Sequence, residues 1–191
     1  MEEKLNEYLR AGEQIRWQSR PENFPVLDGR SKNKILCKCA LVVIVAVGLL
    51  AGHITSSGMP ETGFVAIVLG ITAIVVCSPV LEKMRLMKCR YWITDQRVIQ
   101  MNKDKLFYSM ELYEIDVFKV MADGRAENCL VLGSSVFDDA EKYIRWRANT
   151  PRNEAETGNR RDHAEGLVFY NVEDVETAAA LLKALGCAQV A

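Results

Sequence analysis

Two long hydrophobic runs, separated by a short polar turn, constrain the structure of this 191-residue chain more than any other feature. Residues 39–54 and 63–81 contain no charged side chain. An α-helix rises about 1.5 Å per residue, so about twenty residues cross the roughly 30 Å hydrocarbon core of a bilayer. Two such runs in tandem are rare in a small soluble chain. The sequence therefore predicts a two-helix transmembrane hairpin over residues 34–83.

Basic residues flank the predicted hairpin on one side only. They are Arg30, Lys32, Lys34 and Lys38 before the first run, and Lys83, Arg85, Lys88 and Arg90 after the second. The connecting turn contains neither lysine nor arginine. Because basic flanks are retained on the cytoplasmic side, we expect a multi-pass protein of the cell (inner) membrane with both termini cytoplasmic. These basic side chains are then expected at the membrane surface.

Small residues occur at similar depth in the two runs. Gly48 and Gly52 form a GxxxG pattern in the first run, and Ala66 and Gly70 form a similar small-residue pair in the second. Such pairs allow two helix backbones to approach closely. Glycine is also common in membrane helices generally, so both interpretations stay open: a helix-packing face, or ordinary membrane composition.

The remaining residues are sufficient for one modest soluble domain. In the N-terminal cytoplasmic segment, residues 1–33, Leu5, Tyr8 and Leu9 recur at helical spacing, and Gly12 ends that pattern. Residues 15–17 then alternate between apolar and polar, as in a short strand. No cleavable signal peptide is expected, because this segment is charged and amphipathic.

Residues 88–191 have the pattern of an α+β domain. Runs rich in β-branched and aromatic residues predict strands at 90–94, 98–101, 106–112, 115–121, 129–132 and 167–170. A C-terminal helix is predicted with Asn171 as its N-cap and Gly186 as its stop. Its apolar stripe consists of Val172, Val175, Ala179, Leu182 and Leu185. This order predicts a bent antiparallel β-barrel capped by the C-terminal α-helix.

Several short motifs occur in the same order as in a known family. They are Glu13-x-Ile15-x-Trp17 with Pro21, Tyr91-x-Ile93-Thr94-x-x-Arg97, and Phe169-x-Asn171-Val172-x-Asp174-Val175. In this order around a hairpin, they resemble the bacterial pleckstrin-homology-like membrane proteins of the two-helix hairpin type. The resemblance implies a membrane-tethered domain of pleckstrin-homology type, without family catalytic residues. It also implies that the second motif is a strand–turn–strand element.

An insertion at about residues 134–165 departs from the family pattern. It separates the last two predicted strands and is dense in charges of both signs. Trp146, between two arginines, is a candidate contact for a partner or a lipid surface. The alternative is a solvated insertion at a hairpin tip, which proteins tolerate well.

Nothing in the sequence predicts catalysis. No glycine-rich phosphate loop follows a strand, and no nucleophile has an evident histidine partner in a motif. With two histidines and no CxxC pair among the six cysteines, neither a metal site nor a cofactor is expected. A net charge of −1 argues against nucleic acid as a partner. We expect a protein that is not an enzyme.

Protein partners and lipid headgroups are then the two alternatives, beyond the bilayer itself. Lys103 and Lys105 lie in a predicted hairpin turn with Arg97 nearby, and headgroup-binding pleckstrin-homology domains use such turns. Asp104 separates the two lysines, however, which makes them a poor phosphate cradle. We therefore expect a membrane-anchored protein-interaction or self-assembling scaffold, and binding of anionic headgroups at the cytoplasmic membrane face is the alternative.

Overall fold

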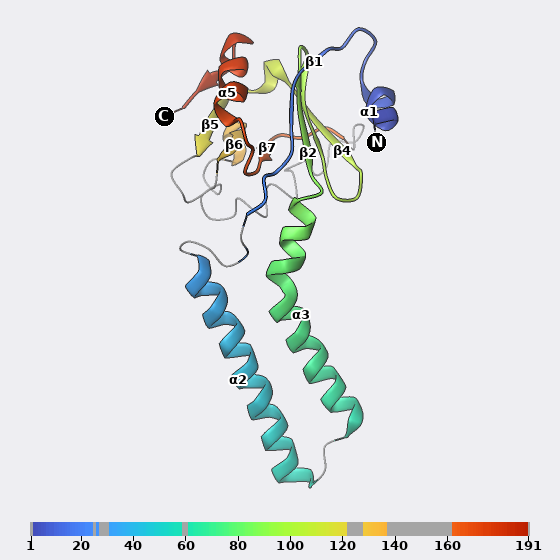
Figure 1. The fold of residues 1–191 in the computed structure, drawn as a ribbon, viewed down its shortest axis with the longest axis vertical. Coiled ribbons are helices and arrows are strands. Elements are labelled where there is room, and N and C mark those ends of the chain that lie inside the picture. The colour runs from blue at the N-terminus through green and yellow to red at the C-terminus, as the bar shows by residue number, and fades with distance from the viewer. Residues whose placement is uncertain are drawn as a thin grey trace. The chain divides into compact units, whose positions relative to one another are not determined.

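The computed structural model describes residues 2–24, 26, 31–58, 61–121, 128–136 and 162–190 (Figure 1). Its helices are α1 (Glu2–Tyr8), α2 (Ser31–Ser57), α3 (Thr62–Leu86) and α5 (Val175–Ala184), with 3-10 turns η1 (Leu112–Glu114) and η2 (Ser134–Val136). Its strands are β1 (Ile15–Ser19), β2 (Arg90–Thr94), β3 (Arg97–Met101), β4 (Phe107–Glu111), β5 (Val117–Met121), β6 (Cys129–Leu132), β7 (Leu167–Phe169) and β8 (Ala188–Gln189).

The chain divides into two compact units. One, here called the sheet unit, comprises Met1–Asn23 together with Arg85–Ala191, and the other, the hairpin unit, is Phe24–Met84. We expected the N-terminal segment to be separate from the domain at residues 88–191. It belongs instead to the same compact unit, so the soluble domain is discontinuous in sequence. The hairpin unit is inserted into it.

In the hairpin unit, α2 and α3 are long and apolar enough to cross a membrane, over Ile35–Ser56 and Thr62–Leu86. Only 6% of the most apolar window of each helix is buried within the structure. A core helix of a soluble protein would have most of this surface covered. Pro79 lies within α3, near its C-terminal end, where the loss of one backbone hydrogen bond is expected.

Among the described residues, α2 and α3 do not approach each other closely at the small-residue pairs. Gly48, Gly52, Ala66 and Gly70 are all exposed. A Cβ atom added at any of the three glycines would meet no heavy atom within 4 Å among the described residues. The glycines therefore do not draw α2 and α3 together within one chain. The two helices contact elsewhere, where the rings of His53 and Phe64 lie 4.4 Å apart.

The first sheet of the sheet unit has the strand order β1-β2-β3-β4, with antiparallel pairing throughout. Ser19, the last residue of β1, pairs with Tyr91 in β2. The chain thus leaves the sheet at the end of β1, forms the hairpin, and returns at the neighbouring position in β2. Sequence patterns identify both strands but not their pairing, because connections within compact domains are usually short.

The second sheet has the order β7-β6-β5-β8. Its first three strands are antiparallel, and β8 runs parallel to β5. The predicted combination of antiparallel strands and a C-terminal helix is thus confirmed, but the described strands form two four-stranded sheets that do not close into the predicted bent barrel. The N-terminal segment continues past the residues that follow β7 through an isolated bridge between Pro21 and Val172 and through hydrogen bonds between Glu22 and Asn171. Because proline has no backbone N–H, it cannot extend this bridge as a regular ladder.

The core lies between the two sheets and α5, which packs beside β5 and β6 (Figure 1). At its centre the Phe169 ring stacks on Tyr91, with centroids 4.6 Å apart, and on Trp17 at 6.1 Å. The predicted apolar stripe of α5 is confirmed, since Val175, Ala179 and Leu182 are buried and Leu185, just after the helix, is partly buried. The predicted N-cap is wrong. Asn171 has a left-handed backbone (φ 45°), and Asp174 precedes the first turn instead.

A second apolar cluster covers the outer face of the first sheet. Leu5 of α1 packs there against Trp92, Ile99 and Met101. Tyr8 adds a ring stacked on Phe107, with centroids 4.7 Å apart. Covered on both faces, the central strands of this sheet are almost fully buried, which explains why β3 is apolar at most of its positions.

Candidate functional site

A buried ion pair joins the start of β3 to the segment before β1. The Arg97 guanidinium donates from Nε and Nη2 to the two carboxylate oxygens of Glu13, each at 3.0 Å. The two side chains are only 5% and 0% exposed. The Thr94 hydroxyl lies 2.8 Å from the same carboxylate and accepts the Arg97 backbone N–H at 2.9 Å. With this many partners, both charges are tolerated in a low-dielectric interior.

The same arginine holds α1 in place. Its Nη2 donates to the Tyr8 carbonyl at 2.8 Å, and its guanidinium lies over the Tyr8 ring, 4.7 Å from the centroid. The Tyr8 hydroxyl donates to the Asp162 carboxylate at 2.9 Å and lies 3.1 Å from the Ser109 hydroxyl. Burial, with a further contribution from Asp162, raises the pKa of Tyr8 to about 12. The Tyr8 hydroxyl therefore stays protonated and continues to donate its hydrogen bond to Asp162.

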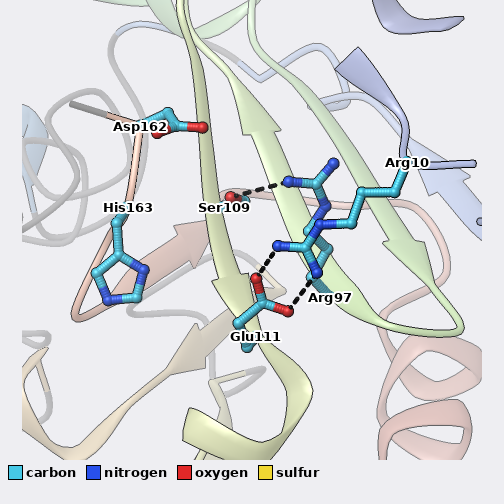
Figure 2. A pocket seen from close by; sticks show the side chains of 6 residues that line it. All are labelled: Arg10, Arg97, Ser109, Glu111, Asp162 and His163. Carbon is cyan, nitrogen blue, oxygen red and sulfur yellow. Dashed lines mark hydrogen bonds and ion pairs between the residues drawn. The ribbon is translucent and has the colours of Figure 1, made fainter. Parts of the chain in front are cut away.

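A polar pocket of about 230 Å³ opens beside this network (Figure 2). It is lined by Arg10, Arg97, Ser109, Glu111, Asp162 and His163. Arg10 forms a bidentate ion pair with Glu111, in which Nη1 donates to Oε2 at 3.0 Å. This pair is less buried than the first, since the Arg10 side chain is 40% exposed.

Two of the lining residues come from the C-terminal end of the long insertion. Residues 162–164 run along β4, where the Ser109 N–H donates to the Asp162 carbonyl at 2.7 Å and the Ala164 N–H donates to the Ser109 carbonyl at 2.9 Å. His163 Nδ1 then lies 3.7 Å from a Glu114 carboxylate oxygen. The pairing of residues 162–164 with β4 could not be predicted from spacing in the sequence, because more than fifty positions separate β4 from residue 162.

The charges that line the pocket are already paired. Arg97 pairs with Glu13 and Arg10 with Glu111, while the Asp162 carboxylate accepts the Tyr8 hydroxyl. Among the described residues, no group of three or more histidine, cysteine or acidic side chains is placed to hold a metal ion. Burial raises the pKa of Cys89 to about 11, so that thiol remains protonated at neutral pH. The arrangement is suited to holding segments together and to presenting a polar surface.

The predicted contact residues do not gather at this pocket. Arg97 lines it but is committed to Glu13, whereas Lys103 and Lys105 lie in the turn between β3 and β4. Lys103 is partly exposed, 3.8 Å from Asp104, and Lys105 is exposed. Trp146 lies outside the described residues. Of the six residues that line the pocket, sequence reasoning singled out Arg97 and missed the other five, because their partners are distant in the chain.

The predicted membrane-surface residues are mostly exposed. Lys32, Lys38, Arg85 and Lys88 are exposed, and Lys83 and Arg90 are partly exposed. The Lys83 ammonium lies 5.6 Å from the centre of the Phe24 ring. Arg30 and the Lys34 side chain lie outside what the structure describes.

Lowering the pH is expected to destabilise the sheet unit through Glu13. Burial alone would raise the pKa of this carboxyl, but hydrogen bonds from Arg97, the Arg10 amide and Thr94 together lower it below 4.5. The stabilisation is therefore present above pH 4.5 and is lost as the pH falls through the lowered folded-state pKa. Melting of the full chain in detergent, followed by tryptophan fluorescence, checks this. The Glu13→Gln variant should melt lower at neutral pH and lose less on acidification; parallel pH curves would contradict the assignment.

Six residues of the motifs that carry the family resemblance are buried in the sheet unit. Glu13, Thr94 and Arg97 form the buried network, while Trp17, Tyr91 and Phe169 form the aromatic stack. Comparisons of the chain with protein-family models, with curated proteins and with solved structures found no match. The resemblance to pleckstrin-homology-like membrane proteins therefore rests on these residues and their order.

Proposed function

We propose that this chain is a non-catalytic, membrane-anchored module of pleckstrin-homology type that binds proteins, including other copies of itself. The observation that carries the proposal is the insertion of the apolar hairpin between two paired strands. Such an insertion tethers the sheet unit to the bilayer at both ends of the hairpin. The partner would bind at the end of the first sheet opposite to the one where β1 ends and β2 begins.

Exposure of the apolar helices supports the membrane anchor. With 6% of each apolar window buried, two helices would otherwise place long hydrophobic surfaces in water. Because β1 pairs with β2, residues 15–19 and 90–94 must lie on the same side of any bilayer. An even number of crossings follows, and α2 and α3 supply two. The basic flanks assign that side to the cytoplasm.

Cysteine labelling in intact cells tests this topology, in a chain from which the native cysteines have been removed. Glu61→Cys, in the turn between α2 and α3, should react with a membrane-impermeant maleimide. Glu22→Cys and Lys88→Cys, on either side of the hairpin, should react only after the membrane is permeabilised. Reaction of either one in intact cells would contradict the proposed orientation.

The partner surface is assigned to the end of the first sheet where β2 ends and β3 begins. At that end, Arg97 of β3 lies opposite Glu111 of β4 in the strand register. This position is about four residues from the other end of the sheet, where Arg90 lies opposite Met101. At about 3.3 Å per residue, the separation along the strands is roughly 13 Å. Tyr113 in η1 follows the pocket residue Glu111 by two positions and is 84% exposed. Exposed aromatic and arginine side chains beside a pocket are typical of protein-binding hot spots.

The pairing of the pocket charges supports a binding role over a catalytic one. A general acid or base must reach the proton that it transfers. Here Arg10 and Arg97 are held by carboxylates, and Asp162 is held by a tyrosine that stays protonated. A partner would contact this end as a rigid polar surface.

Photo-crosslinking tests the protein-binding proposal in native membranes. We expect p-benzoylphenylalanine in place of Tyr113 to give a discrete protein adduct on illumination. The same residue in place of Glu173, an exposed position before α5, serves as the matched control. An adduct with the mass of two chains indicates self-assembly, and another discrete mass indicates a different protein. Absence of any protein adduct at position 113, or equal adducts at both positions, would overturn the proposal.

Binding of anionic headgroups is the second candidate function, and one observation favours it. The residues around the end of the first sheet where β1 ends and β2 begins are mostly basic: Arg20, Lys88, Arg90, Lys103 and Lys105, against Glu22 and Asp104. This charge lies at the end of the sheet away from the pocket, so a headgroup contact and a protein contact do not compete for the same residues.

A further inference from the structure

The polar pocket between β3, β4 and residues 162–163 has a negative charge balance. Its lining residues and their direct ion-pair partners include four carboxylates and two guanidinium groups. The carboxylates are those of Glu13, Glu111, Glu114 and Asp162, and the guanidinium groups are those of Arg10 and Arg97. The surplus of negative charge favours a cationic ligand over an anionic one.

The two arginines of the pocket are not available to an anion. Arg97 donates to both carboxylate oxygens of Glu13, and Arg10 forms a bidentate pair with Glu111. An anionic ligand would have to displace one of these carboxylates from its arginine. The displaced charge would then lie in a site where the Glu13 and Glu111 side chains are only 0% and 9% exposed, which is unfavourable.

One carboxylate of the pocket has an oxygen to offer. Oδ2 of Asp162 accepts the Tyr8 hydroxyl at 2.9 Å, while Oδ1 of Asp162 has no hydrogen-bond partner among the residues that the structure describes. The Asp162 carboxylate points toward the strand that carries Ser109 and Glu111 (Figure 2). Its backbone is fixed, because its carbonyl accepts the Ser109 N–H at 2.7 Å. The pocket therefore presents one charged acceptor at a fixed position.

A single acceptor oxygen distinguishes between the two common cationic side chains. A guanidinium group binds a carboxylate best through two parallel hydrogen bonds, which need both oxygens. An ammonium group is a compact charge with three donors that rotate freely, so one carboxylate oxygen is sufficient. The pocket volume of about 230 Å³ is below the roughly 300–1,000 Å³ of sites for drug-sized ligands, and it is suited to one side chain.

We propose that the pocket binds a lysine side chain of the partner protein. The proposal rests on the protein-binding role proposed above and names the chemistry that this site recognises. The lysine ammonium donates to Oδ1 of Asp162, and its charge offsets the surplus of carboxylates around it. The exposed ring of Tyr113, two positions after Glu111, offers apolar surface to the segment that carries the lysine.

Carbodiimide coupling in native membranes tests the lysine directly, because it joins a carboxylate to an amine only when the two are in contact. On the wild-type chain, we expect an isopeptide bond between Asp162 and a lysine of another protein molecule, located by mass spectrometry of the crosslinked peptides. A lysine from a second copy would identify the partner as this chain. Glu173, which is exposed and lies before α5, is the matched control and should give no defined product.

Charge variants provide an independent measurement. Asp162→Asn retains an oxygen for the Tyr8 hydroxyl but removes the charge, so it should lower the yield of the photo-adduct at position 113 about tenfold. Asp162→Glu should restore part of the yield, and Glu173→Gln should leave it unchanged. Melting of each variant in detergent, followed by tryptophan fluorescence, checks that the sheet unit is folded.

The outcomes separate the lysine site from the protein-binding role. Absence of an isopeptide bond at Asp162, or an adduct yield that the folded Asp162→Asn variant leaves unchanged, would overturn the lysine site while leaving protein binding intact. Absence of any protein adduct at position 113 in the otherwise wild-type chain would overturn both. Because the isopeptide bond is sought in the wild-type chain, this part of the test does not depend on the folding of a variant.

Discussion

Replacing Glu13 by alanine is expected to lower the free energy of unfolding of the sheet unit by about 3–5 kcal/mol. The substitution leaves the Arg97 guanidinium charged in a site where its side chain is 5% exposed. It also removes the acceptor that lies 2.8 Å from the Thr94 hydroxyl. Denaturant unfolding of the full chain in mild detergent, followed by tryptophan fluorescence, measures the loss.

A double substitution and a neighbouring control make this result specific. Glu13→Leu with Arg97→Met removes both charges together, so it should recover much of the lost stability, because the apolar pair avoids the desolvation penalty. Gln18→Ala, at an exposed position in β1, should change the unfolding free energy by no more than about 0.5 kcal/mol. If the double variant is as unstable as Glu13→Ala, the cost lies in packing around these side chains and not in the orphaned charge.

Leu182→Ala is expected to destabilise the sheet unit by about 2–5 kcal/mol. Leu182 lies in the middle of the apolar stripe of α5, is fully buried, and belongs to the cluster that joins both sheets. Truncation removes its buried methyl groups and leaves a cavity that the surrounding side chains fill only in part. The same detergent unfolding measurement, compared with the wild-type chain, gives the difference.

The next residue along the helix is the matched control for this prediction. Lys183 is exposed, so Lys183→Ala should shift the unfolding free energy by no more than about 0.5 kcal/mol. Equal shifts for the two variants would show that α5 is not held to the core through Leu182.

The helices and most strands could be predicted because their signals are local. The uncharged runs, the β-branched and aromatic residues of β2 and the stripe of α5 are each contained within a few turns or residues. Two errors also have local causes. The left-handed backbone of Asn171 delays α5, and β8 has only two residues, both exposed, which leaves it without an apolar pattern.

The site could not be predicted because its pairing is long-range. Glu13 and Arg97 are 84 positions apart, and the hairpin lies between them. Arginine is usually found at the surface, so its sequence position favoured a ligand contact over a buried structural role. The contact of Asp162 with Tyr8 spans 154 positions. The order of the motifs indicated only a resemblance to a family, and the distances that join the motif residues appear only in the folded chain.

The insertion of the hairpin between β1 and β2 also imposes an order on biosynthesis. About seventy residues must be translated after β1 before its partner strand exists. At a translation rate of about 5–20 residues per second, roughly 4–14 s pass before β2 is available to pair with β1. During that interval the two apolar runs leave the ribosome and, in the proposed topology, enter the bilayer. A chain whose hairpin crosses only once would place β1 and β2 on opposite sides of the membrane. The first sheet can therefore be completed only after correct insertion of the hairpin. A chain whose hairpin is not inserted correctly has an open strand edge that cellular quality control can recognise.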